Sequence, residues 1–249
     1  MQKNDPVIIH VPHASTLIPK EERRHFVTCE LERELAVMTD HYCDDLYDTG
    51  AEMVRFPISR LICDPERFRD DADESMSEVG MGAVYTKCSD GTPLKNVTKR
   101  HREEILRTYY DVHHKRLEDA VLRKLEECGT CLILDGHSFY EKALPYEPDQ
   151  RQMRPEICIG TDEVHTPKPL ADMLCAYFLH KGYTVAVNRP FAGAIVPLRF
   201  YRTDPRVHAV MIEVNRGLYM DHDLRKTEGY ERVRQDLAEA VEMLREGKW

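Results

Sequence analysis

The amino-acid sequence predicts an α/β fold with three layers, in which helices cover both faces of a mostly parallel β-sheet. Short apolar runs bounded by glycine or proline alternate with longer stretches whose apolar residues recur at helical spacing. Three of the apolar runs, residues 7–11, 131–134 and 207–212, are followed by histidine or glutamate. Polar groups at the carboxyl ends of parallel strands are typical of ligand sites in such sheets. The 249 residues are enough for one large core, and we expect residues 1–249 to form a single domain.

The first third of the chain predicts two strands and two helices. The strand at residues 7–11 leads to His13, and a short helix is expected over residues 19–26. A stronger helix is expected over residues 31–49, because apolar residues recur there every three or four positions. Residues 53–56 indicate a second strand, and residues 59–64 a further extended piece.

The middle and the end of the chain continue the alternation. The polar, acidic stretch 69–95 predicts a long loop, which we interpret as a functional flap. The elements expected after it are helix 98–127, strand 131–134 ending at Gly136, strand 157–160, helix 169–180, strand 184–187, strand 207–212 and helix 226–245.

Composition excludes several classes of protein. The net charge is −9 and no basic cluster is long enough to follow a phosphate backbone, so a nucleic-acid partner is not expected. No apolar run approaches the roughly 20 residues that span a bilayer, and no signal peptide is apparent. Eight scattered cysteines include one C-x-x-C, at Cys128 and Cys131, without the second pair of a zinc ribbon. These observations favour a soluble cytoplasmic protein with reduced cysteines and no membrane partner.

The two histidines at strand ends, His13 and His137, suggest a metal site. A catalytic zinc takes about three His, Asp or Glu ligands and keeps one position open for water. Asp40 and Asp44 lie one turn apart on the helix expected over residues 31–49, and either could supply the acid. Asp40 is placed nearer the strand ends than Asp44. The alternative is that each histidine bonds a backbone carbonyl and has only a structural role.

Glu213 follows the apolar run 207–212, where burial would raise the pKa of a carboxyl group. It could therefore act as a general base towards a metal-associated water. Asn215 and Arg216 could equally be partners that make Glu213 purely structural.

Arginines in loops after strands suit a small acidic substrate, because a guanidinium binds carboxylates bidentately. The candidates are Arg60, Arg67, Arg189, Arg199, Arg202 and Arg216. For each of them, the alternative to binding substrate is an ion pair with a nearby Asp or Glu.

Six segments taken together resemble the N-formylglutamate amidohydrolase family. They are residues 12–15 (PHAS), 39–47 (TDHYCDDLY), 59–67 (SRLICDPER), 135–138 (DGHS), 188–193 (NRPFAG) and 212–220 (IEVNRGLYM). They occur in order over nearly the whole chain.

The resemblance implies a fold similar to the zinc carboxypeptidases and hydrolysis of an N-formyl or N-acyl amino acid. By it, His13, His137 and Asp40 or Asp44 would hold one Zn²⁺, and Glu213 would activate the water. Arg60 and Arg67 would hold the substrate carboxylate, with Asn188 and Arg216 as further substrate contacts. His114 resembles a histidine of the family's long helix, without an assigned role.

The chain departs from the family's pattern at three positions. Glu66 stands where an asparagine is common, and Arg189 and Ala194 stand where an acid and a second glycine are common. These positions would face the substrate.

The sequence thus predicts a zinc-dependent amidohydrolase acting on a small acidic amide. Two alternatives stay open, a metallopeptidase of the same fold acting on short peptides and a non-catalytic α/β binding module. The sequence leaves the oligomeric state open.

Overall fold

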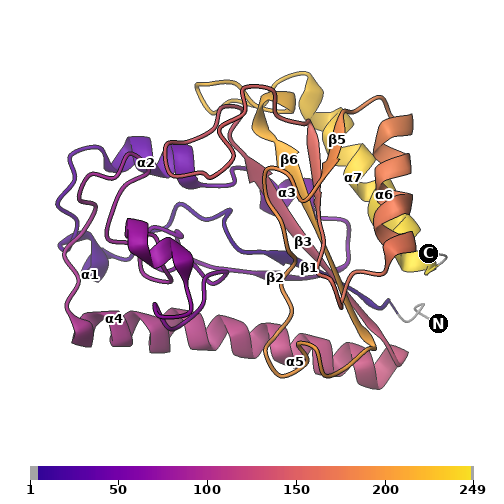
Figure 1. Ribbon diagram of the computed structural model, residues 1–249, viewed down its shortest axis with the longest axis horizontal. Coiled ribbons are helices and arrows are strands. Elements are labelled where there is room, and N and C mark those ends of the chain that lie inside the picture. The colour runs from indigo at the N-terminus through magenta and orange to yellow at the C-terminus, as the bar shows by residue number, and fades with distance from the viewer. Residues whose placement is uncertain (1–4, 248–249) are drawn as a thin grey trace.

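The computed structural model describes residues 5–247 and contains one six-stranded sheet flanked by helices (Figure 1). The spatial order of the strands is β2-β1-β3-β6-β4-β5. Their bounds are β1 (Val7–Val11), β2 (Glu52–Arg55), β3 (Cys131–Phe139), β4 (Ile157–Gly160), β5 (Val185–Val187) and β6 (Val207–Asn215). Strands β2, β1, β3 and β6 are parallel, whereas β4 and its parallel neighbour β5 run opposite to β6. The predicted mostly parallel α/β sheet is therefore confirmed.

Helices cover both faces of this sheet. The α-helices are α1 (Lys20–Arg23), α2 (Leu31–Met38), α3 (Cys43–Leu46), α4 (Lys99–Ile105), α5 (Asp111–Cys128), α6 (Lys168–His180) and α7 (Gly229–Glu246). Short 3-10 turns occur at η1 (Ser75–Val79) and η3 (Arg216–Leu218), and a π turn, η2 (Leu106–Tyr110), joins α4 to α5. Figure 1 shows α6 and α7 on one side of the strands and the long α4–η2–α5 helix on the other. None of the helices in residues 5–247 is long and apolar enough to cross a membrane.

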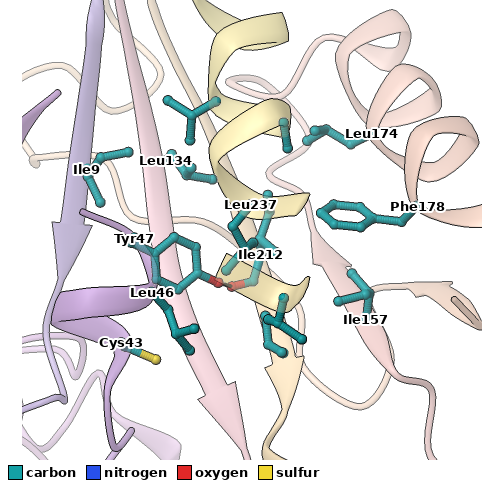
Figure 2. Packing of buried hydrophobic residues seen from close by; sticks show 14 of the residues in the cluster. Ile9, Cys43, Leu46, Tyr47, Leu134, Ile157, Leu174, Phe178, Ile212 and Leu237 are labelled. Atoms are coloured by element: carbon teal, nitrogen blue, oxygen red, sulfur yellow. Dashed lines mark hydrogen bonds between the residues drawn. The ribbon is translucent and has the colours of Figure 1, made fainter. Parts of the chain in front are cut away.

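The alternation of side chains along the strands assigns each residue to one of the two faces. Ile9, Leu134 and Ile212 pack with α3, α6 and α7, as Figure 2 shows. Ile8 and Ile133 belong to the opposite face, where they pack against α5. A third cluster joins α2, residues 56–63, residues 81–94 and α4 beside the sheet.

Tyr47 supports the central strand at Gly136. Its hydroxyl donates to the Ile212 carbonyl at 2.7 Å and lies 3.1 Å from the His137 carbonyl oxygen. A Cβ atom at position 136 would lie 2.9 Å from the Tyr47 ring. Glycine is therefore needed there, because the ring occupies the space of any side chain.

The prediction of one helix over residues 31–49 is wrong. Helix α2 ends at Met38, Thr39 is extended, and Tyr42 adopts a left-handed conformation with φ 68° before α3 begins. The break turns Asp40 away from the direction that a continuous helix would give it. The amide of Asp40 instead donates to the carbonyl of His13 at 2.9 Å.

Three other predicted elements differ in the structure. The central strand does not stop at Gly136 but continues to Phe139. Residues 59–64 form turns rather than an extended piece. The stretch 69–95 is not an open flap, because η1 lies within it and Met81, Ala83 and Tyr85 are buried in the third cluster.

Candidate active site

Three neighbouring strands place polar side chains on the α5 face of the sheet, at its carboxyl edge. His10 of β1 pairs in register with Asp135 of β3, and His137 of β3 pairs with Glu213 of β6. All four positions continue the pattern of Ile8, Ile133 and Ala209, which pack against α5. The same alternation that builds the core thus delivers a buried polar cluster just beyond it.

His13, directly after β1, and His137 come together beside Asp40. The ring centroids of the two histidines are 5.0 Å apart. Oδ2 of Asp40 lies 3.2 Å from Nδ1 of His137 and 3.7 Å from Nδ1 of His13. The predicted association of His13 and His137 with Asp40 is present in the structure.

The other ring nitrogen of each histidine is held by a carboxylate. Nε2 of His13 lies 2.9 Å from Asp64, and Nε2 of His137 lies 3.1 Å from Asp135 and 3.0 Å from Glu66. Both rings are therefore fixed with Nδ1 directed towards Asp40. Nδ1 of His13 is buried and has no hydrogen-bond partner among the described residues.

Asp40 is anchored from three sides. Its Oδ1 accepts a 2.8 Å hydrogen bond from Arg216, and its Oδ2 accepts one from the amide of Ser138. Burial would raise the pKa of Asp40, but the close approach of the His13 and His137 rings and the charge of Arg216 outweigh it and hold the pKa well below the ordinary value. Asp40 is a stable anion beside two imidazoles.

The surrounding carboxylates raise the pKa of both histidines. Burial lowers the pKa of His137, yet the charges of Glu66 and Asp135 more than compensate and raise it well above the usual value. The pKa of His13 is also raised, because Asp64 and Asp40 outweigh burial and the charge of Arg60. This excess of negative charge attracts cations, whether protons or a metal ion.

Glu213 lies at the end of the buried β6, next to His137. Its Oε2 is buried and has no hydrogen-bond partner among residues 5–247. Burial, aided by the charges of Asp40 and Glu66 and opposed by that of His137, raises the pKa of Glu213 to about 7. A carboxyl group in this state can accept a proton and release it near neutral pH.

Glu66 is the site residue that the sequence analysis missed. The predictions treated it only as a departure from the family's pattern. In the structure His13, Glu66 and His137 each offer a ligand atom within 4.8 Å of the others, and so do His10, Glu66 and Asp135. The strand pattern could have indicated His10 and Asp135, since they alternate with buried Ile8 and Ile133, but no local signal pointed to Glu66.

A cavity of about 450 Å³ opens above these groups. Its size and mixed lining are those of a site for a small molecule. The polar residues that line it include His13, Asp40, Arg60, Glu66, Arg67, Arg69, Tyr110, His114, His137, Glu213 and Arg216.

The predicted substrate arginines differ in how far they are engaged. Arg60 donates two hydrogen bonds to Asp64, and Arg216 bonds Asp40, Ser138 and the Val37 carbonyl. Nε of Arg67 is buried without a hydrogen-bond partner among the described residues, at 3.7 Å from Asp64. Arg67 is therefore the lining arginine best able to accept a ligand.

Two predicted site residues lie outside this arrangement. Asp44 follows the break in the helix and pairs with Arg55 at 2.7 Å, with its side chain 37% exposed. It is not brought to the histidines, because α3 turns it towards β2. Asn188 is exposed, bonds Thr161 and does not line the cavity.

Comparisons with known proteins agree with this architecture. The family model for N-formylglutamate amidohydrolase matches residues 5–220. The N-formylglutamate deformylase of Pseudomonas aeruginosa is 26% identical over 95% of this chain and 88% of its own length. That of Pseudomonas putida is 28% identical over 96% of this chain and 89% of its own length.

Two solved structures share the fold. The crystal structure of N-formylglutamate amidohydrolase from Ralstonia eutropha JMP134 superposes with a TM-score of 0.85 at 23% identity, covering 98% of this chain and 94% of that one. A gene product of Agrobacterium tumefaciens gives a TM-score of 0.68 at 19% identity, covering 97% and 94%. With the family model matching most of the chain, the conclusion is plain: the chain belongs to the N-formylglutamate amidohydrolase family.

Proposed function

We propose that this chain, as one domain, is a metal-dependent amidohydrolase that cleaves the amide bond of a small N-formyl or N-acyl acidic amino acid. The observation that carries the proposal is the constellation of His13, His137, Asp40 and Glu213 at the floor of a cavity lined by arginines. The curated relatives bear the name N-formylglutamate deformylase, which supports this substrate class.

The donor set fits a divalent metal ion such as Zn²⁺. Two imidazole Nδ1 atoms face one carboxylate oxygen of Asp40, and the buried Nδ1 of His13 lacks any other described partner. Ligating histidines usually have their second nitrogen held by a carboxylate, as Asp64 and Asp135 hold these two. We propose His13, His137 and Asp40 as ligands, with Glu66 as the alternative acid. When bound, such an ion polarises the amide carbonyl and lowers the pKa of water towards about 7.

Glu213 supplies the proton transfers. Its buried carboxylate accepts a proton from the water that attacks the amide carbon, and then donates that proton to the leaving nitrogen as the C–N bond breaks. A pKa of about 7 suits both steps, because the group can then exchange protons in either direction at neutral pH. The products are the free carboxylic acid, formate in the case of an N-formyl substrate, and the amine.

Substrate carboxylates are held by the arginine side of the cavity. Arg67 has free hydrogen-bonding capacity, and the adjacent Arg60 adds positive charge although Asp64 engages it. Arg216 is committed to Asp40 and Ser138, so its role is to fix Asp40 rather than to bind substrate.

The decisive experiment measures metal content, melting temperature and kcat on the same preparations. The wild type is expected to hold about one divalent ion per chain and to hydrolyse N-formylglutamate. Substituting His13→Ala or His137→Ala removes both the ion and the activity. Asp40→Asn weakens metal binding, whereas Asp44→Asn leaves it unchanged.

Glu213→Gln separates the base from the ligands. The variant should keep the ion and the fold but lose about 10²–10⁴-fold in kcat, the usual contribution of positioned acid–base catalysis. A Glu213→Gln protein that stays active but melts at a lower temperature would remove Glu213 from the mechanism.

A further inference from the structure

One long helix, made of α4, η2 and α5, holds the chain segment that carries the substrate arginines. We call residues 59–71 the arginine segment. Tyr110 donates its hydroxyl to the Arg67 carbonyl at 2.8 Å, and Nε2 of His114 lies 2.8 Å from the Pro65 carbonyl. The two contacts fall on either side of Glu66.

The same helix holds the next residues of the segment through charged contacts. The guanidinium of Arg69 bonds Asp111 at 2.8 Å and Glu103 at 2.9 Å. Arg102 reaches back to the Arg69 carbonyl at 2.8 Å and to Asp71 at 2.7 Å. The segment is thus fixed to the helix from Pro65 to Asp71.

The π turn Leu106–Tyr110 makes this arrangement possible. In a regular α-helix each residue turns about 100°, so positions eight apart, such as 102 and 110 or 103 and 111, would point about 80° apart. The π turn takes up one extra residue and reduces the difference to about 20°. Arg102 and Glu103 on α4 can therefore face the arginine segment together with Tyr110 and Asp111.

Tyr110 and His114 lie ring against ring, and each hydrogen-bonds a backbone carbonyl of the arginine segment. They are one turn apart, and their rings lie 4.1 Å from each other with an interplanar angle of 31°. Burial lowers the pKa of His114 to about 4, so the ring is neutral at neutral pH and donates through Nε2 to the Pro65 carbonyl. Tyr110 is 7% exposed, which shields its hydrogen bond from water.

The backbone between these contacts decides where the Arg67 guanidinium lies. Arg60 is oriented by its own two hydrogen bonds to Asp64, whereas Nε of Arg67 makes no hydrogen bond among the described residues and has only a 3.7 Å ion pair with Asp64. Its direction therefore depends on the backbone of residues 65–67. On the other side of the segment, the Asp64 side chain accepts from the Glu66 amide, and the Asp64 carbonyl accepts a longer hydrogen bond of 3.4 Å from the Arg67 amide.

We infer that Tyr110 and His114 are positioning residues, which set the backbone of residues 65–67 so that Arg67 meets the carboxylate of the bound substrate. This inference rests on the proposed function and assigns a role to the π turn and to His114. Neither residue takes part in proton transfer, since both act through backbone carbonyls. Their loss should therefore affect substrate binding more than turnover.

The test uses Tyr110→Phe and His114→Phe, which keep the ring stack and remove one hydrogen bond each. Tyr109→Phe is the matched control, because Tyr109 lies in the same π turn and its hydroxyl has no hydrogen bond in the described structure. KM and kcat are measured with N-formylglutamate, and Kd with glutarate, a dicarboxylate without a scissile bond. We expect KM and Kd to rise about fivefold in each variant, the usual weight of one hydrogen bond, with kcat within twofold and the control unchanged.

A double-mutant cycle with Arg67→Ala shows whether the effect passes through Arg67. In that background Tyr110→Phe should change kcat/KM by less than twofold. Unchanged KM and Kd in both variants, or an equal loss in the Arg67→Ala background, would overturn the inference. A wild type that neither cleaves N-formylglutamate nor binds glutarate would instead refute the proposed function, and the inference with it.

Discussion

The arginine segment and the loop at residues 188–194 look alike in sequence but behave differently in the structure. Each follows a short strand, contains a proline and carries arginine. The arginine segment is held by the long helix and by buried Asp64, and it directs Arg60 and Arg67 into the cavity. The 188–194 loop is tied to the end of β4 through Asn188, and Asn188 and Arg189 remain exposed.

In this molecule the arginines of the segment anchored to the long helix line the cavity, whereas Arg189 of the other loop does not. The 188–194 loop contributes Phe191 and the small residues 192–194 to the cavity instead. The arginine segment therefore supplies positive charge to the cavity, and the 188–194 loop supplies part of its uncharged wall. The experiments below test this division, beginning with the largest expected effect.

Asp64→Asn should destabilise the protein most. Asp64 is fully buried and accepts hydrogen bonds from Arg60, from Tyr85 and from the Glu66 amide, besides its contact with His13. Losing its charge leaves Arg60 buried without a counter-ion, which costs about 3–5 kcal/mol. The free energy of unfolding in urea measures this, with Asp44→Asn at an exposed pair as the control. A loss below about 1 kcal/mol would show that Asp64 does not organise the segment.

Arg67→Ala should lower kcat/KM for N-formylglutamate by about 10–100-fold. This corresponds to the loss of charged hydrogen bonds of about 1.5–3 kcal/mol to a carboxylate. Arg189→Ala, in the other loop, should leave kcat/KM within about twofold. Equal losses of kcat/KM in the two variants would contradict the view that the arginine segment, and not the 188–194 loop, supplies the charge that binds substrate.

Lys95, which contacts the arginine segment, makes the free energy of unfolding of the protein depend on pH. Its buried ammonium donates to the Ile62 carbonyl at 2.8 Å, and burial lowers its pKa from 10.5 to about 7. Between pH 7 and 10 the unfolded chain holds a proton that the folded chain lacks, so this group makes stability rise with pH by up to about 1.4 kcal/mol per unit. Lys95→Met should remove that rise.

The check on Lys95 is a comparison of unfolding free energies of the wild type and Lys95→Met at pH 7 and pH 8.5. Deprotonation of unfolded cysteines near pH 8.5 lowers the stability of both proteins equally, so it cancels in the difference between them. A difference between the two proteins that does not change with pH would show that Lys95 stays charged in the fold.

Asn188→Gly should have the smallest effect. Asn188 has φ 52°, which glycine adopts without strain, and its side chain bonds the amide and hydroxyl of Thr161. The exposed side chain is worth about 1 kcal/mol or less of stability, and kcat/KM should not change. A marked rise in KM would return Asn188 to the substrate site, where the sequence predicted it.

Much of the fold was predictable because apolar periodicity reports directly on burial. It predicted the six strands, the long helix and the placement of His13, His137 and Glu213 near the carboxyl ends of strands, although β3 and β6 continue two residues past His137 and Glu213. Asp40 was predicted beside them, but from a helix that does not exist there. Periodicity cannot detect the left-handed Tyr42, which ends the helical path and separates Asp40 from Asp44.

The contributions of Glu66, Tyr110 and His114 were not predictable for a different reason. They depend on how residues 59–71 lie against a helix that begins 28 residues later, at Lys99. No local pattern encodes that docking. The resemblance to the family named the motif around Arg67 but could not show what holds it.

The π turn also limits how the gene for this protein can change. Substitutions at exposed positions of the long helix would leave Arg102 and Glu103 on the same face as Tyr110 and Asp111. Deleting one codon within residues 106–110 would restore a regular α-helix with good local geometry. It would nevertheless rotate Arg102 and Glu103 away from Tyr110 and Asp111. We therefore expect chain length between α4 and α5 to be inherited more strictly than the identity of most of the side chains there.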